Sequence, residues 1–152
     1  MKKTVGLVKD KGYNNRQRCV SFLKALEARD VSTMLLYCTP DASMHVVPLG
    51  SSFTGLVHSF GKFFWNGFLE SFADLKIIFH DMHWIEEEAE KVTLLVTLQA
   101  IHVFPFAGIN SSGSQLDCWH IFIFQLNDLY QITSIEVNWN HPEMKAQLMH
   151  EE

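Results

Sequence analysis

The chain has 152 residues, of which 47% are hydrophobic and 19% are charged, and its formal charge is −5 at pH 7. This length and composition favour one folded domain over residues 1–152 and exclude a disordered chain. A negative charge without a basic cluster argues against a nucleic-acid partner. No apolar run reaches the length that crosses a membrane, so we predict no membrane partner either.

The cysteines and the N-terminus indicate where the protein resides. Cys19, Cys38 and Cys118 form no CxxC pair, and an odd number of thiols is typical of a reducing compartment. The first residues, MKKTVGLVKDKGYNN, contain two lysines but lack the apolar core of a signal peptide. We therefore predict a soluble cytoplasmic protein.

The first part of the chain predicts two helices and a strand. Asn14 followed by Gln17 resembles a capping box, and apolar residues at helical spacing follow it. Asp30 can cap a second, short helix formed by VSTMLLYC, which Pro40 is expected to end. The residues ASMHVV at 42–47 then predict a strand, and PLGSSFTG predicts a loop.

A third helix is expected from about residue 57 to residue 72. Its apolar stripe consists of Phe60, Phe63, Phe64, Phe68 and Phe72. Two glycines within it, Gly61 and Gly67, lower its stability relative to alanine. This helix would form one wall of any pocket, where Phe64, Trp65 and Phe68 suit a hydrophobic or ring-shaped ligand.

Four consecutive strands follow, from LKIIFHDMHWIEE through VTLLVTLQAIHVF and QLDCWHIFIFQL to QITSIEVNWN, and the tail predicts a last turn of helix. Short connections pair such strands in one antiparallel sheet, so the fold class is α+β. The strands are apolar on both faces, whereas a sheet covered by helices on one side shows water a polar face. A second copy of the chain on the outer face, giving a homodimer, explains this pattern.

The segment HDMH holds a tempting group of side chains, His80, Asp81 and His83. Residues three apart in a strand point to opposite faces, so the two histidines are not expected to share an ion, and we predict no metal site. Asp81 and His83 share a face and form a candidate acid–base pair, the alternative being an exposed rim. Phosphate-binding loops and nucleophile elbows have no counterpart in the sequence.

Four stretches, in the same order, resemble the nuclear transport factor 2-like superfamily and, within it, the SnoaL-like polyketide cyclase group. They are FLKALEARDVSTMLLYCTPDASMHVVP, FTGLVHSFGKFFWNGFLESFADLKIIFHD, LQAIHVFPFAG and HIFIFQLNDLYQITSIEVNWN. The third is similar to the family's GTH stretch, with Ala100 for the glycine and His102 for the histidine. The resemblance covers about residues 16–141, and the core is placed at about 14–141. It implies a cone-shaped, curled antiparallel sheet closed by the N-terminal helices and one long helix around one pocket.

The resemblance also implies cofactor-independent chemistry, because family members include aldol cyclases and isomerases, alongside proteins without catalysis. The closing strand departs from the family pattern, since Asn140 follows the tryptophan where the family has its acid–base aspartate. An amide cannot accept a proton at neutral pH, but it can hydrogen-bond a substrate oxygen. We therefore expect any proton transfer to use another side chain.

Three histidines at apolar strand positions are the candidate catalytic groups: His120, His102 and His45. Imidazole titrates near neutral pH and serves as acid or base, although each of the three could equally be structural. Ala100, two residues before His102, would leave room for a ligand. His120 shares its strand face with Cys118, and burial there would keep its ring neutral.

The end of the last strand allows two interpretations. Simple alternation buries Trp139 and exposes Asn138 and Asn140, whereas the family pattern places all three at the pocket mouth as substrate-binding groups. Two functions remain open as well. One is a cofactor-independent isomerase or cyclase acting on a small apolar oxygenated metabolite through a histidine. The other is a non-catalytic ligand-binding or dimerisation module with the same fold.

Overall fold

The computed structural model describes residues 2–80 and 90–149, with side chains described from residue 11 onward. The elements, in chain order, are α1 (Lys2–Glu27), α2 (Val31–Leu36), β1 (Cys38–Val46), η1 (Val47–Leu49), β2 (Thr54–Leu56), η2 (Val57–Gly61), α3 (Lys62–Ser71), β3 (Phe72–Phe79), β4 (Lys91–His102), β5 (Gln115–Leu126), β6 (Ile132–Trp139) and α4 (His141–Leu148). No helix in this part of the chain is long and apolar enough to cross a membrane.

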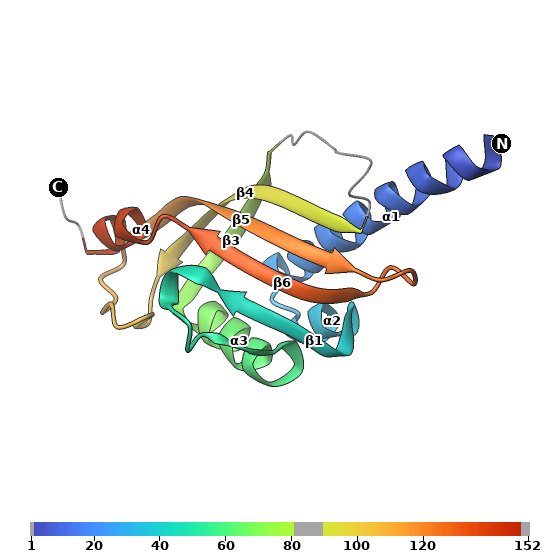
Figure 1. The fold of residues 1–152 in the computed structure, drawn as a ribbon. Helices are drawn as coiled ribbons and strands as arrows, with labels where there is room; N and C mark the ends of the chain where they lie inside the picture. Colours follow the sequence, from blue (N-terminus) through green and yellow to red (C-terminus); the bar gives the residue numbers. More distant parts are fainter. Residues whose placement is uncertain (1, 81–89, 150–152) are drawn as a thin grey trace.

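The strands form one curled sheet in the order β2-β1-β6-β5-β4-β3. The strands β3 to β6 pair with one another antiparallel, which confirms the predicted α+β class and the predicted sheet. The first strand, β1, lies parallel to β6 and brings the N-terminal part of the chain to the sheet. Figure 1 shows α3 across one face of the sheet, and α4 at the end opposite the N-terminus of α1.

The inner face of the sheet carries the core. Along β5, side chains alternate between buried and more exposed positions, as a strand with one covered face requires. Helices α1 and α3 cover this inner face, and the ring of Phe22 contacts both Trp65 and Phe124, at centroid distances of 6.4 and 5.6 Å. Such edge-to-face aromatic contacts fix the helices against the sheet.

The helices before the sheet differ in part from the prediction. Helix α1 begins at Lys2, so Asn14 lies inside it and does not cap it, because residues 2–13 contain no proline to stop a helix. Asp30 caps α2 as predicted, with Oδ1 accepting the backbone N–H of Thr33 at 3.1 Å. Pro40 lies within β1, in the irregular stretch of its pairing with β6, where a missing N–H is tolerated.

The predicted third helix is shorter than expected. It starts with a π-helical turn, η2, continues as α3, and ends at Ser71, so Phe72 already belongs to β3. Phe63 is 80% exposed and is not part of the apolar stripe, because Trp65 takes the inward direction instead. Strand β2, within a stretch predicted as loop, and the full length of α4 were also missed. Asp81 and His83 lie outside the described residues.

Candidate functional site

A small cavity lies inside the cone between α3 and the sheet. It is lined by Phe64, Trp65, Phe68, Leu98, Phe106, His120, Phe122, Val137, Trp139 and Met144. Its volume is about 10 Å³, close to the space that one water molecule needs. The predicted wall of Phe64, Trp65 and Phe68 is found there, and His120 is the one side chain among the lining residues that can serve as a proton acceptor.

His120 sits on the inner face of β5 and is 2% exposed. Its ring stacks on Trp139 at a centroid distance of 5.0 Å. Its Nδ1 lies 3.4 Å from the carbonyl oxygen of Cys118 and 3.6 Å from the Sγ of the same residue. When Nδ1–H donates to this carbonyl, Nε2 carries the lone pair, and Nε2 makes no hydrogen bond with the described residues.

Burial sets the protonation state of this pair. It lowers the pKa of His120 to about 4 and raises the pKa of the Cys118 thiol to about 12. Both groups are therefore neutral at pH 7, because the apolar surroundings disfavour the imidazolium and the thiolate. A neutral imidazole of this kind accepts a proton rather than donating one.

Trp65 contributes a second polar group to the cavity wall. It is 2% exposed, and its indole Nε1 has no hydrogen-bond partner among the described residues. A buried donor without a partner costs about 1–3 kcal/mol. The sequence identified Trp65 as an apolar lining residue, but its unpaired N–H depends on how α3 packs across the sheet and had no sequence signal.

His102 is also buried on the inner side, but it lies apart from His120 and does not line the same cavity. Its ring stacks on Phe72 at a centroid distance of 5.0 Å. Neither ring nitrogen has a partner with hydrogen-bond geometry among the described residues. Burial lowers its pKa, and the backbone of Phe104 offsets part of this effect. Ala100, its predicted companion, is buried but does not line the His120 cavity.

The other predicted site residues lie outside this cavity. His45 is half-buried between the buried Met44 and Val46, so it faces the outer side of the sheet, and its expected place in the pocket is corrected. Asn140 is exposed and caps α4, with Oδ1 accepting the N–H of Glu143 at 3.1 Å.

Simple alternation, rather than the family pattern, describes the end of β6. Trp139 is buried and lines the cavity, whereas Asn138 is half-buried on the other face. The expectation that Asn138 and Asn140 furnish the pocket mouth was wrong, because β6 stays regular up to Trp139 and the chain then turns directly into α4.

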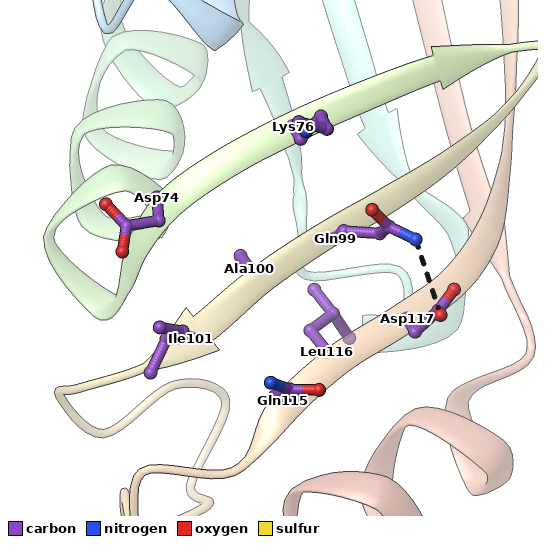
Figure 2. Close-up of a pocket in the computed structure, with 8 residues that line it drawn as sticks. All are labelled: Asp74, Lys76, Gln99, Ala100, Ile101, Gln115, Leu116 and Asp117. Atoms are coloured by element: carbon purple, nitrogen blue, oxygen red, sulfur yellow. Dashed lines mark hydrogen bonds between the residues drawn. The ribbon is translucent and has the colours of Figure 1, made fainter.

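The wider hollows of the molecule are open to solvent. Figure 2 shows one of about 390 Å³ on the outer side of the sheet, where the side chains of Gln99 and Asp117 face each other at 3.5 Å and Asp74 and Lys76 project from β3. Its charged groups are exposed, so water screens them and they offer weak electrostatics. A second hollow of about 520 Å³ lies between residues 107–112 and α4.

The part of the chain that the structure describes contains no group of side chains that could bind a metal ion. There, no three His, Cys, Asp or Glu side chains lie together in an arrangement that could hold an ion. The small cavity with His120 and Trp65 is therefore the candidate site, because it combines an apolar wall with buried polar groups that lack partners.

Comparisons with known proteins identify the fold. No protein-family profile matches the sequence, and no curated protein matches it. Among solved structures, TsrD from Streptomyces laurentii superposes with a TM-score of 0.74 at 18% identity, covering 90% of this chain and 95% of its own. A candidate SnoaL-like polyketide cyclase from Jannaschia sp. CCS1 gives 0.71 at 15% identity, covering 88% and 92%. An LEH-like epoxide hydrolase from M. tuberculosis gives 0.67 at 14% identity, covering 91% of each chain.

These likenesses show that the chain has the nuclear transport factor 2-like fold in the form found in the SnoaL-like group, as the sequence resemblance implied. At such identities the fold is what is shared. The chemistry has to be argued from the residues of this chain.

Proposed function

We propose that the chain is a cofactor-independent isomerase or cyclase that acts on a small, largely apolar metabolite carrying a carbonyl group. The observation that carries this proposal is the neutral His120 imidazole in an apolar cavity, with Nε2 free of described partners and the unpaired indole N–H of Trp65 in the same wall. Cyclases and epoxide hydrolases among the structural relatives support the same class.

In the proposed reaction, Nε2 of His120 accepts a proton from a carbon next to the substrate carbonyl. The electron pair of the broken C–H bond moves into the carbonyl, whose oxygen gains negative charge. Trp65 donates its N–H to that oxygen, a role typically worth about 3 kcal/mol per donor. His120 then returns the proton to a different carbon, which completes an isomerisation. Alternatively, the enolate carbon attacks a second carbonyl and closes a ring, and the oxygen of that carbonyl takes the proton back from His120.

The strength of the base restricts the substrate. A pKa of about 4 makes His120 a weaker base than free imidazole. The carbon that loses the proton must therefore be activated twice, by a carbonyl and by a second unsaturated group. Cyclic β-diketones and β,γ-unsaturated ketones meet this requirement and match the apolar wall.

The test is conversion of 3-cyclohexenone to its conjugated isomer, followed by the rise in ultraviolet absorbance. His120→Gln should abolish the reaction, and Trp65→Phe, which keeps the ring but removes the N–H, should lower kcat by about 10²–10³. Glu70→Gln changes an exposed side chain of α3 that lines neither the cavity nor the outer hollow and should leave the rate unchanged. Equal rates for wild type and His120→Gln would contradict the proposal.

A non-catalytic dimerisation module is the second candidate, and the cavity volume of about 10 Å³ favours it. Such a space holds no metabolite unless the wall moves. Ketone binding distinguishes the two candidates. If the cavity stays closed, millimolar ketone should not change the NMR signals of the His120 ring. A catalyst must open and would show one.

We also propose that a second copy of the chain covers the outer face of the sheet. Trp119 and Ile78 are both 38% exposed there, and a shallow hollow of about 490 Å³ is lined by His80, Leu95, Trp119 and Ile121. Lys76 on β3 and Asp117 on β5 flank this apolar area on either side of β4, so two copies related by a two-fold axis can offer opposite charges to each other.

Light scattering at micromolar concentration tests this assembly. We expect a dimer for wild type and a monomer for Trp119→Glu, which places a charge in the apolar area. Leu129→Glu changes an equally apolar but separate exposed side chain and should remain dimeric. A monomeric wild type would overturn the proposal.

Because all three cysteines are free thiols, we place the protein in a reducing compartment, the cytoplasm.

A further inference from the structure

We infer that the tight turn from Phe106 to Ile109 is a displaceable plug, and that an aromatic ligand which replaces the Phe106 ring joins the His120 cavity to the buried His102. The joined pocket would take a flat ligand of at least two rings with a hydroxyl group at its His102 end. This inference rests on the proposed function, because it assigns the substrate class and the way into the same site.

The position of Phe106 carries the first step. Its ring lines the His120 cavity and contacts the rings of Phe68 and Phe72 at centroid distances of 5.7 and 5.3 Å. Phe72 in turn stacks on His102 at 5.0 Å. The His102 ring therefore lies within about 10 Å of the Phe106 ring. Removing that one ring would extend the cavity to the Phe72 ring, against which His102 stacks.

His102 supplies the second step. It is fully buried, and neither of its ring nitrogens has a hydrogen-bond partner with proper geometry among the described residues. Buried polar groups are nearly always paired, so an exception indicates a missing partner. A hydroxyl group both donates and accepts, and it would pair with either nitrogen of a neutral imidazole.

The turn itself is closed by its own backbone hydrogen bonds. Phe106 and Ile109 exchange two backbone hydrogen bonds, of 3.0 and 2.8 Å, across Ala107 and Gly108, whose φ angles are 50° and 78°. Two successive residues at positive φ form the type I′ geometry of a self-contained turn. The Phe106 ring therefore needs no strand ladder to be broken when it leaves.

Space for this movement exists on the outer side. The hollow of about 520 Å³ between residues 107–112 and α4 borders the turn and is lined by its outer residues. The inner wall that stays behind consists of phenylalanine rings on α3 and β3. Rings of this kind select flat aromatic ligands, and the two histidines place polar contacts at the two ends.

The test uses 2-naphthol as the probe, naphthalene as its match without a hydroxyl, and NMR of the imidazole ring signals. In wild type, 2-naphthol should shift the signals of both His102 and His120. Phe106→Ala should bind 2-naphthol about tenfold more tightly or better, because the population with the plug displaced no longer limits the affinity. Should this variant not fold, Phe106→Leu should show a smaller gain in the same direction.

Two controls isolate the plug and the histidine. Phe60→Ala removes a half-buried ring that stacks on Phe64 but does not line the cavity, so its affinity should match that of wild type. His102→Phe should bind naphthalene and 2-naphthol equally, whereas a protein with His102 should prefer 2-naphthol by about tenfold.

The outcomes separate this inference from the proposed function. A 2-naphthol shift at His120 alone, or weaker binding by Phe106→Ala, would overturn the plug while His120-dependent ketone isomerisation could still stand. If His120→Gln converts the ketone as fast as wild type, while both histidines of wild type still respond to 2-naphthol, the catalytic proposal is overturned and the joined pocket remains.

Discussion

The buried imidazole of His120 ties the stability of the fold to pH. In the folded protein burial lowers its pKa to about 4, whereas in the unfolded chain it titrates at about 6.5. Between these values the unfolded chain binds a proton that the folded chain does not. The free energy of unfolding therefore falls as the pH falls from about 6.5 toward 4, and this contribution is fully present above the unfolded pKa.

The size of the effect follows from the two pKa values. Between pH 7 and pH 4.5, a shift from about 6.5 to about 4 removes about 2 kcal/mol from the free energy of unfolding. For a chain of this length, that corresponds to roughly 4–8 °C in Tm. His102 and His141, whose pKa values burial also lowers, add to the total in wild type.

Urea unfolding at both pH values, in wild type and in His120→Phe, isolates the contribution of His120. Phenylalanine keeps a flat ring against Trp139 but cannot titrate, so this variant should lose about 2 kcal/mol less than wild type on acidification. The other histidines remain in both proteins and cancel. His80→Gln, at an exposed position, should behave like wild type. An equal loss in wild type and His120→Phe would refute the reasoning.

Further substitutions test the backbone and the caps. A Cβ at Gly67, in the middle of α3, would meet nothing within 4 Å, so Gly67→Ala should raise the free energy of unfolding by about 1 kcal/mol. Gly55→Ala should lower it, because its Cβ would lie 2.7 Å from the Cβ of Phe60. Ala107→Gly should raise it by about 0.5–1 kcal/mol, since Ala107 has a φ of 50°. Asn140→Ala should lower it by about 1 kcal/mol, while Asn140→Asp should keep the cap, and thermal unfolding measures all five variants.

The sheet could be predicted because its evidence is periodic. Apolar runs of strand length, separated by turn residues, placed β4, β5 and β6, and alternate positions along them grouped His102 and His120 with apolar residues on the face that the structure buries. One buried face forces the register of every strand in a sheet, so a local pattern has a global consequence. The Asp30 cap succeeded for a similar reason, because a cap needs no tertiary partner.

The site could be predicted only in part, because its properties depend on packing between distant elements. That Trp65 lacks a hydrogen-bond partner, and that the cavity holds about one water, follow from how α3 crosses the sheet. Phe63 illustrates the same limit: it shares the helical spacing of its neighbours, but a wider side chain, Trp65, occupies the inward direction. The separation of His102 from His120 follows from the strand register, because His120 pairs with Val96 on β4 and His102 lies at the far end of that strand.

The end of β6 explains why the closing sequence NWN holds a tryptophan between two amides. A strand that turns its residue 139 inward must turn residues 138 and 140 away from the cavity, and the wide ring of Trp139 closes the space beside His120. Asn140 then stands where α4 begins, and a short side chain with an oxygen is what a helix start needs. Asparagine and aspartate serve that purpose equally, so a carboxylate at position 140 would cap α4 and still face away from the cavity. Under the proposed function His120 transfers the proton, so restoring an aspartate at position 140 should change neither the rate nor its pH dependence.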